Sequence, residues 1–370
     1  MKKILFLIPN LAHGGAERVL VNLVNNLDPN KFDVTVQTLF DIGVNRQYLN
    51  PHVHYIPGAK KQFRGNTTLM KIFSSEKLYK SVIHGTYDIL VSYLEGPTSR
   101  IIAGCHEPDT KKVAWVHIEL PTAKQAAIGF RSPAEAIKLY DTYDRLIAVA
   151  DSVKQTFEKS LYVNTPLEVL YNTNETEKIK KLAEESVSDV EFEREGVKIC
   201  SVAKIVHPKG FDRLLCVHKR LLDEGLKHTV FLLGIGEDRE RLETEAKKLG
   251  VSGTFIFLGF KDNPYKYVKN CDLYVCSSRR EGFSTAVTES LIVGTPVVST
   301  DCSGARELLG EHDEYGIVVE NSGEGIYKGV KRMLTEPQLI AYYREKAAIR
   351  GKKFSREETV TAVERMFEAL

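Results

Sequence analysis

Short apolar runs and helical stretches alternate along this chain, and the alternation begins again past its midpoint. In the first half, runs rich in β-branched and aromatic residues recur near residues 3–8, 33–39, 53–56, 88–93, 112–116, 145–149 and 167–170. After a charged stretch at 178–195 that is predicted to be helical, the pattern resumes at Lys198 and continues near 229–233, 254–258, 272–276, 296–299 and 316–319. Strands that alternate with helices are typical of parallel sheets covered by helices. The chain is therefore predicted to be an α/β protein.

The length of the chain and the restart of its pattern both indicate two domains. A chain of 370 residues is too long for one ordinary sheet domain and allows two domains that each bury a core. We place the boundary near residue 172, which gives domains at 1–172 and 173–354. The last segment, residues 355–370, has the apolar spacing of an amphipathic helix.

Charge and cysteine content narrow the classes of protein. The net charge is +2, and residues 1–172 carry 20 basic against 16 acidic side chains, so this half is only mildly basic. With no recognition motif, nucleic acid is a poor partner. The six cysteines contain no Cys-x-x-Cys pair, which favours core packing in a reducing compartment over disulfides or metal. No signal-peptide pattern and no apolar run of about 18 residues is visible, which predicts a cytoplasmic protein that is not inserted in a bilayer.

Two glutamates eight positions apart, Glu281 and Glu289, flank the start of a predicted helix. Because the strand-like run at 272–276 precedes them, Glu281 is expected in a strand-to-helix loop and Glu289 about two turns into the helix. Glu289 is suited to accept hydrogen bonds from two ribose hydroxyls, and Glu281 from hydroxyls of a second group. Alternatively, Glu281 is a solvated loop acid and Glu289 is an unrelated acid on a surface helix.

The backbone between these glutamates is suited to hold an anion. The N–H groups around Phe283, Ser284 and Thr285 are predicted to have no intrahelical partners, and the helix dipole adds partial positive charge there. A phosphate is the natural ligand of such a helix start.

Two lysines five residues apart follow the strand-like run that begins at Lys198. Lys204 and Lys209 are expected on a strand-to-helix loop at the C-terminal end of that strand, where open α/β sheets bind ligands. Paired ammonium groups suit a diphosphate, although two loop lysines are often only solvated.

The first half contributes a glycine pair and a histidine at strand ends. The run at 3–8 leads to Gly14 and Gly15, and paired glycines let the backbone approach a ligand closely. The run at 112–116 ends at His117, which is either a ligand contact or a histidine with its hydrogen bonds satisfied inside the fold.

Taken together, these motifs resemble the retaining GT-B glycosyltransferases of family four, which include capsule, lipopolysaccharide and phosphatidylinositol sugar transferases. The resemblance covers nearly the whole chain. The family's Gly-Gly loop is matched by Gly14 and Gly15, its mid-domain histidine by His117, and its Glu-x7-Glu motif is intact. Its Arg and Lys pair becomes Lys204 and Lys209, so a lysine replaces an arginine and loses the bidentate fork.

The resemblance implies two Rossmann-like domains whose parallel sheets face each other across a cleft. The first domain would bind the acceptor, the second would bind a nucleotide-sugar donor, and the C-terminal helix 355–370 would pack back on the first. Loops that resemble the family's nucleotide-cradling loops contain Gly234, Gly236 and Phe260, and the backbone from Gly282 to Ser284 would decide which sugar is accepted.

The resemblance also implies a reaction. A hexose or N-acetylhexosamine would move, with retention of configuration, from a nucleotide sugar to a glycan or a polyprenyl-diphosphate-linked glycan in surface polysaccharide synthesis. UDP is the default nucleotide. No Asp-x-Asp motif is present, and Lys204, Lys209 and the helix start can neutralise the leaving diphosphate, so neither metal nor cofactor is expected. His117, Glu281 and the two lysines are the predicted catalytic residues.

The segment from 59 to 84 interleaves basic and apolar residues. Six cations, Lys60, Lys61, Arg64, Lys71, Lys77 and Lys80, stand against one acid, Glu76. Such a segment is either a surface helix packed on the sheet or a basic amphipathic helix on an anionic leaflet. The pattern alone favours the surface helix, but family members that use lipid-linked acceptors place a basic, apolar patch in this half. The resemblance therefore implies the second, a peripheral contact with the inner face of the cell membrane.

Three other functions remain as alternatives. A Rossmann oxidoreductase would need Gly-x-Gly-x-x-Gly after the first strand, and Gly14 and Gly15 do not supply that spacing. A non-catalytic nucleotide-sugar-binding subunit of a polysaccharide assembly complex is kept open by Lys204. A nucleotide-sugar epimerase of the same fold would require its own acid and base.

Overall fold

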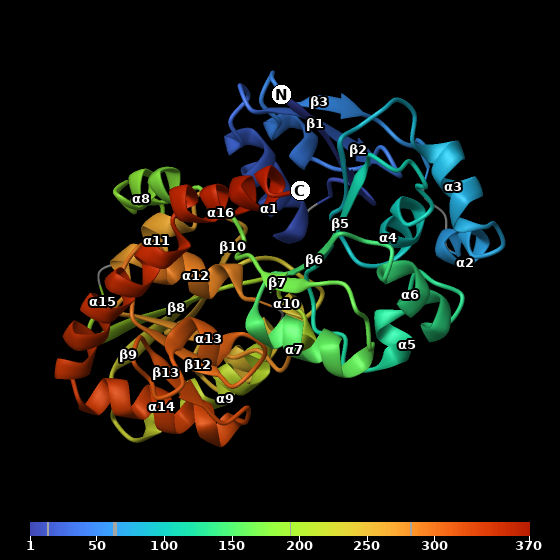
Figure 1. Ribbon diagram of the computed structural model, residues 1–370. Helices are drawn as coiled ribbons and strands as arrows, with labels where there is room; N and C mark the ends of the chain where they lie inside the picture. The colour runs from blue at the N-terminus through green and yellow to red at the C-terminus, as the bar shows by residue number, and fades with distance from the viewer. Residues whose placement is uncertain (13–14, 62–64, 193, 282) are drawn as a thin grey trace. The chain divides into compact units, whose positions relative to one another are not determined.

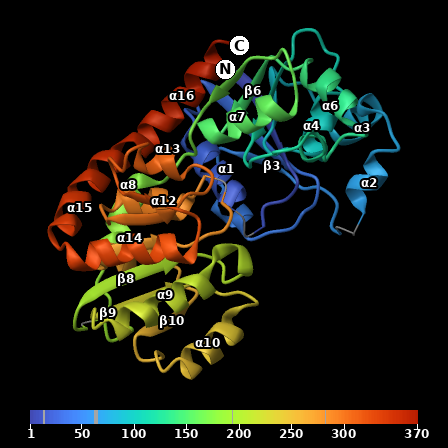
Figure 2. The same ribbon diagram turned by 90° about the horizontal axis from the view of Figure 1, so that it is seen from below.

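The computed structural model describes residues 1–12, 15–61, 65–192, 194–281 and 283–370. These residues form two compact units, one of Met1–Asn174 with Arg356–Leu370 and one of Glu175–Ser355 (Figures 1 and 2). The sequence-based boundary near 172 lies two residues before this division.

The first unit alternates strands and helices from its first residues. Its elements are β1 (Lys2–Ile8), α1 (Gly15–Asn26), β2 (Phe32–Thr38), η1 (Asn45–Tyr48), β3 (His54–Ile56), α2 (Asn66–Met70), α3 (Ser75–Val82), β4 (Ile89–Ser92), α4 (Pro97–Ile102), β5 (Lys111–Val116), α5 (Ala123–Ala126), α6 (Pro133–Tyr140), β6 (Arg145–Ala148), α7 (Asp151–Ser160), β7 (Leu167–Val169) and α16 (Arg356–Glu368). Within the described residues its strands form one parallel sheet in the order β3-β2-β1-β4-β5-β6-β7.

Helix α16 belongs to the first unit although it follows the second in sequence. Its Phe367 is fully buried, and its ring meets those of Phe6 and Phe32 edge to face at 5.9 and 6.0 Å. Lys2 Nζ donates to the Phe367 carbonyl at 2.8 Å. The C-terminal helix therefore completes the core beside β1.

The second unit repeats the same plan. Its elements are α8 (Thr176–Ala183), β8 (Val197–Val202), η2 (His207–Lys209), α9 (Phe211–Asp223), β9 (His228–Leu233), α10 (Arg239–Lys248), β10 (Phe255–Gly259), α11 (Tyr265–Asn270), β11 (Leu273–Cys276), α12 (Thr285–Ile292), β12 (Val297–Thr300), α13 (Ala305–Leu309), β13 (Ile317–Val319), α14 (Gly323–Thr335), α15 (Gln338–Gly351) and η3 (Lys352–Phe354). Its parallel sheet has the order β10-β9-β8-β11-β12-β13 among the residues described. The prediction of two parallel-sheet domains is confirmed.

In both sheets the strand order reverses next to the first strand of the unit. The chain moves outward from β1 to β3 and then returns to add β4 on the other side of β1, and β8 and β11 repeat this relation. Open α/β sheets bind ligands outside the carboxyl ends of the strands at such a point. The loops after β1, β4, β8 and β11 are therefore expected to carry ligand-binding residues.

Two predicted helices are shorter in the structure. The charged stretch at 178–195 is helical only in α8, because the chain then turns to stack Phe192 on Phe231 with ring centroids 4.6 Å apart. The segment at 59–84 is not one amphipathic helix but α2 and α3, separated at residues 71–74. Ser74 ends the break by accepting the Lys77 N–H and capping α3. Arg64 lies outside the described residues.

The cysteines follow the expected pattern with one exception. All six are free, and four of them are buried. Cys216 is exposed on α9, so packing does not account for that thiol.

Candidate functional site

Glu281 and Lys209, predicted separately, form an ion pair in the second unit. Lys209 Nζ donates to Glu281 Oε1 at 2.6 Å, and both side chains are partly buried. The Ser278 hydroxyl donates to the same oxygen at 2.6 Å. The pair forms because Lys209 follows β8 and Glu281 follows β11, which are neighbours in the sheet. The structure thus places a cation and an acid at the switch point of this sheet.

A second ion pair shapes the loop that carries Glu281. Arg279 forms a bidentate pair with Asp212 at the start of α9, with N–O distances of 2.7 and 2.6 Å, and its NH1 also donates to the His207 carbonyl. The Arg279 guanidinium lowers the pKa of Asp212 below its usual value. Gly210 lies between these loops with φ +67°, and a Cβ there would meet the Ser277 carbonyl oxygen at 2.1 Å. The loops after β8 and β11 are therefore locked together.

The sequence analysis missed Asp212 and Arg279 as residues that shape the site. It also missed Arg213, whose NH2 donates to the Ser277 carbonyl at 2.6 Å and whose NH1 donates to Asn321 Oδ1 at 3.0 Å. The position of Arg279, two residues before Glu281, was the available signal, but nothing in the sequence pairs it with Asp212.

Glu289 lies on α12 as predicted, but only at the fifth residue of the helix. It is thus just over one turn from the helix start, and the expectation of two turns was wrong because the helix begins at Thr285. Tyr265, the first residue of α11, donates its hydroxyl proton to Glu289 Oε1 at 3.0 Å. Glu289 is partly buried, so its carboxylate keeps contact with solvent.

The start of α12 is organised by its own cap. The Ser284 hydroxyl accepts the Val287 N–H at 3.4 Å, as an N-cap does. Phe283 is buried and meets Phe354 edge to face at 5.9 Å, so its side chain belongs to the core and only its backbone could meet a ligand. Thr285 is the first helical residue. Gly282, predicted to contact the sugar, lies outside the described residues.

The remaining donor-site predictions fall on loops around β8, β9 and β10. Lys204 is exposed on the loop after β8, and Phe260 is exposed directly after β10. A Cβ at Gly234 or Gly236 would meet the carbonyl oxygens of Ala203 or Ile205 at 1.9 and 2.1 Å. Close packing of the loops after β8 and β9 therefore requires these two glycines, whether or not a nucleotide also lies against them.

His117, directly after β5, is buried and electrically neutral. Burial lowers its pKa to about 3, against a hydrogen bond to the Tyr93 backbone that raises it. That bond uses one ring nitrogen as donor, and among the described residues Nε2 has no hydrogen-bond partner. A buried, unpaired imidazole nitrogen is costly unless a ligand occupies it. Because the other nitrogen carries the proton, Nε2 is an acceptor.

Glu95 supports His117 from the neighbouring strand end. Its Oε2 accepts the His117 backbone N–H at 3.0 Å, and burial raises the pKa of Glu95 above its usual value. Gly15 begins α1, and a Cβ there would meet no described atom within 4 Å, so packing does not require glycine at this position. Gly14 lies outside the described residues.

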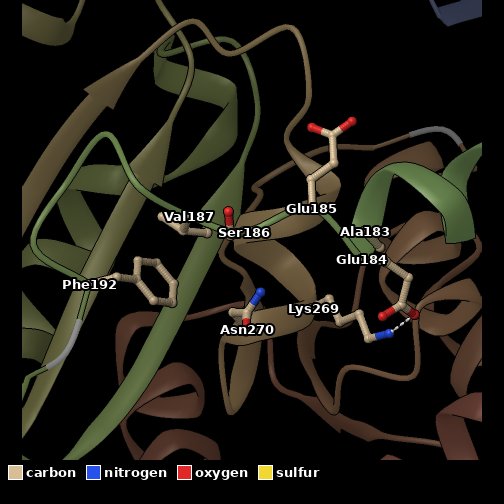
Figure 3. A pocket seen from close by; sticks show the side chains of 8 residues that line it. All are labelled: Ala183, Glu184, Glu185, Ser186, Val187, Phe192, Lys269 and Asn270. Atoms are coloured by element: carbon tan, nitrogen blue, oxygen red, sulfur yellow. Dashed lines mark hydrogen bonds and ion pairs between the residues drawn. The ribbon is translucent and has the colours of Figure 1, made fainter.

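One cavity of about 300 Å³ lies elsewhere in the second unit (Figure 3). It is lined by the end of α8 and the segment after it (residues 183–187), by Phe192, and by Lys269 and Asn270 on α11. Figure 3 shows Lys269 paired with Glu184 at its margin. None of the predicted site residues lines this cavity.

The described residues form neither a cluster of metal ligands nor a helix that could span a membrane. No cluster of three or more histidine, cysteine, aspartate or glutamate side chains there is placed to hold a metal ion. None of the described helices combines the length and the apolarity that crossing a bilayer requires.

Two family models divide the chain between them. Glycosyltransferase Family 4 matches residues 13–178, and Glycosyl transferases group 1 matches residues 183–351. Together the two models cover most of the chain, which therefore belongs to the glycosyltransferases. Among curated relatives of this glycosyltransferase, a Campylobacter jejuni N-acetylgalactosamine-N,N'-diacetylbacillosaminyl-diphospho-undecaprenol 4-alpha-N-acetylgalactosaminyltransferase is 28% identical over 96% of both chains. The lipopolysaccharide core biosynthesis glycosyltransferase LpsE of Rhizobium meliloti is 32% identical over 44% of this chain and 47% of its own.

Solved structures show that the glycosyltransferase has the GT-B fold. Anabaena HepE in complex with UDP and glucose has a TM-score of 0.77 at 18% identity and covers all of both chains. Sucrose-phosphate synthase from Thermosynechococcus elongatus has a TM-score of 0.78 at 13% identity, over 100% of this chain and 99% of its own. At these identities the likeness concerns the fold alone.

Proposed function

We propose that this glycosyltransferase moves a hexose or N-acetylhexosamine from a UDP-sugar to a lipid-linked glycan, with retention of configuration and without a metal ion. The observation that carries the proposal is the Lys209–Glu281 pair at the carboxyl ends of β8 and β11, with Glu289 on the helix that follows. These residues offer a cation for a diphosphate and two acceptors for hydroxyl groups, which are the functional groups of a nucleotide sugar.

Departure of the nucleoside diphosphate leaves negative charge on its phosphate oxygens. Lys209, Lys204 and the backbone N–H groups at the start of α12 supply positive charge for it, which is the role that a divalent ion has in metal-dependent transferases. When the diphosphate arrives, Lys209 can exchange part of its bond to Glu281 for a phosphate oxygen, and Glu281 becomes available to a sugar hydroxyl. The departing diphosphate oxygen takes up the proton of the acceptor hydroxyl, so no dedicated base is required.

His117 acts in this proposal as a neutral acceptor rather than as an acid. With its pKa at about 3, the imidazole stays uncharged at neutral pH, and Nε2 can accept a hydrogen bond from a substrate hydroxyl.

Relatives support the acceptor class and the donor. The name of the Campylobacter jejuni enzyme specifies an undecaprenyl-diphosphate-linked acceptor and an alpha linkage. An alpha product is what retention gives from an alpha-linked donor. Structures of Anabaena HepE with UDP-glucose support UDP as the nucleotide.

We further propose that the first unit contacts an anionic membrane through residues 59–84, as a peripheral protein of the inner leaflet. The end of α2 and the turn that follows it expose three large apolar side chains, Leu69 at 46%, Ile72 at 71% and Phe73 at 47%. The carbonyls of residues 70–73 all accept hydrogen bonds from two guanidinium groups, those of Arg100 and Arg131. Such a turn can enter an interface without exposing an unpaired carbonyl, and the lysines around it suit anionic headgroups.

The test of the transferase function is a panel of UDP-, GDP- and ADP-sugars in EDTA, with and without a polyprenyl-diphosphate-linked amino sugar. We expect one UDP-sugar to raise the melting temperature of the wild type, to be slowly hydrolysed, and to be transferred to the lipid-linked acceptor with an alpha linkage by NMR. Loss of transfer in EDTA with recovery in manganese would overturn the metal-free mechanism.

The same panel decides the alternative of a non-catalytic partner subunit, which the lysine at position 204 keeps open. That function predicts binding of a sugar nucleotide with neither hydrolysis nor transfer. Appearance of an epimerised sugar nucleotide without acceptor would instead indicate an epimerase.

A further inference from the structure

Tyr265 connects α11 to the acid on α12 that is proposed to bind ribose. Helices α11 and α12 are neighbours in the second unit (Figure 1). The Tyr265 side chain is only 3% exposed, and its hydroxyl donates to Glu289 Oε1 at 3.0 Å. None of the sequence motifs pointed to this tyrosine.

The position of Tyr265 is fixed from both ends. Its backbone N–H is accepted by Asn263 Oδ1 at 3.2 Å, which holds the first turn of α11. Asn263 is in turn tied to α8 and the segment after it, because its Nδ2 donates to the Leu182 carbonyl at 2.8 Å and to Glu185 Oε2 at 2.9 Å. With a buried ring and an anchored backbone, the phenol is held in place before any ligand binds.

Glu289 needs such support if it binds a ribose. A vicinal diol is recognised best when both carboxylate oxygens lie in the plane of the two hydroxyls, and a partly buried glutamate can otherwise change rotamer. The hydrogen bond from Tyr265 to Oε1 narrows the range of rotamers that Glu289 can adopt. Each carboxylate oxygen has two lone pairs, so Oε1 can accept from Tyr265 and from a ribose hydroxyl together.

We propose that Tyr265 is a positioning residue that orients Glu289 toward the 2′- and 3′-hydroxyls of the donor ribose. It thereby sets the preference of this protein for ribonucleotide over 2′-deoxyribonucleotide donors. The proposal rests on the proposed function, because it assumes that Glu289 meets a nucleotide ribose.

The same helix offers a matched control. Tyr267, also buried, donates its hydroxyl proton to Asp189 Oδ1 at 2.6 Å, and Asp189 also pairs with Lys261. Tyr267→Phe therefore removes a phenol–carboxylate hydrogen bond from α11 and leaves Glu289 untouched. Any loss that reflects only a less stable α11 should occur in both variants.

The experiment measures binding of UDP and 2′-deoxy-UDP by calorimetry. GDP, ADP and their 2′-deoxy forms are measured in parallel. The wild type should prefer UDP over its deoxy form by about tenfold or more, as expected for one charge-assisted hydrogen bond. Tyr265→Phe should weaken UDP about tenfold and 2′-deoxy-UDP by less, because the deoxy form contacts Glu289 through its 3′-hydroxyl alone, so that the preference for UDP falls toward one. Tyr267→Phe should keep the wild-type ratio.

Two additional measurements separate positioning from damage. Affinity for inorganic diphosphate, which needs Lys209 but no ribose contact, should be equal in the wild type and Tyr265→Phe. In a Glu289→Ala background, Tyr265→Phe should have no further effect on the UDP ratio, because the tyrosine acts through that glutamate.

The outcomes are distinct. The role of Tyr265 would be overturned if Tyr265→Phe and Tyr267→Phe had the same preference for UDP over 2′-deoxy-UDP. It would also be overturned if Tyr265→Phe lowered that preference equally with and without Glu289. Either result would leave the transferase function standing. Equal binding of UDP and 2′-deoxy-UDP by the wild type would show that Glu289 does not contact the 2′-hydroxyl, which would overturn this inference. Failure of the wild type to bind any nucleoside diphosphate would overturn the proposed function and, with it, this inference.

Discussion

The two units share a sheet plan but place different chemistry at the same point of it. Both sheets reverse strand order beside their first strand, at β1 and β4 in one unit and at β8 and β11 in the other. In the second unit this point carries a charged pair, Lys209 and Glu281. In the first unit Glu95 follows β4 at this point and supports a neutral, buried His117, which follows β5, the next strand of the sheet. The sheet plan determines where these loops lie, and the residues of the loops determine whether that place is charged or neutral.

The largest expected effect tests the charged side of this comparison. Glu281→Ala should lower transfer by about 10²–10³-fold, because it removes the acceptor that Lys209 and Ser278 hold in place. UDP release would measure activity, and circular dichroism would show that the fold is kept. Glu184→Ala, which breaks another ion pair of the second unit, is the control. Activity within about twofold of the wild type would remove Glu281 from the site.

Lys209→Ala should weaken UDP binding by about 10–100-fold, since one charge-assisted contact to the diphosphate is lost. The loss should be smaller for UMP and negligible for uridine, as measured by calorimetry. Lys219→Ala breaks an exposed pair with Asp223 on α9 and should change none of these affinities. Equal losses for UDP and uridine would show that Lys209 supports the fold rather than the phosphates.

Acid should destabilise the second unit more than the first. Burial lowers the pKa of His218 to about 3 and also lowers that of His228, its hydrogen-bond partner at 2.8 Å, whereas the site of the first unit has one such histidine, His117. The pKa values of these histidines are lower in the folded than in the unfolded protein, so the unfolded chain binds more protons in acid. The free energy of unfolding is therefore highest above about pH 6.5 and decreases as the pH falls toward 3. At pH 5, His218 and His117 should each cost about 2 kcal/mol, so the larger loss in the second unit comes from His228.

Hydrogen exchange read by mass spectrometry at pH 6.5 and 5.0 would compare the two units, after correction for the intrinsic rate. The variant His218→Leu/His228→Leu should lose most of the extra acid sensitivity of the second unit. Equal protection of the second unit at both pH values would contradict the buried-histidine account.

The exposed apolar side chains between α2 and α3 should contribute to membrane binding and not to transfer activity in solution. Ile72→Ser/Phe73→Ser should lower partition onto vesicles with phosphatidylglycerol by about tenfold or more, because burial of each apolar side chain is lost. Ile349→Ser, an exposed isoleucine of the second unit, is the matched control. Co-sedimentation that the paired variant leaves unchanged would reject the turn as a membrane contact.

The smallest expected effect concerns the neutral side of the comparison. With a pKa of about 3, His117 does not change its charge near pH 6.5. The pH profiles of kcat/KM for the wild type and His117→Asn should therefore have the same shape around that pH. A His117-dependent step between pH 6 and 7 would show that the imidazole becomes charged and that its role is acid–base.

Much of the fold could be predicted because its signals are local. Buried parallel strands appear as short apolar runs, and the restart at Lys198 marks the second sheet. The failures lie where tertiary contacts overrode a local pattern. One helix was expected at 178–195, but the chain leaves the helix and stacks Phe192 on Phe231. One helix was also expected within 59–84, but it is interrupted between α2 and α3, where the guanidinium groups of Arg100 and Arg131 bind the backbone carbonyls.

The candidate site divides in the same way. The sequence by itself determined which residue types stand at strand ends, and so identified Lys209, Glu281, Glu289 and His117 as candidates. Only the tertiary structure decided which of them meet, because strands that are neighbours in a parallel sheet are far apart in sequence. Packing joined Lys209 to Glu281, placed Tyr265 against Glu289, and removed water from His117. Distances and burial set the strength of these electrostatic interactions, and neither is contained in the spacing of residues along the chain.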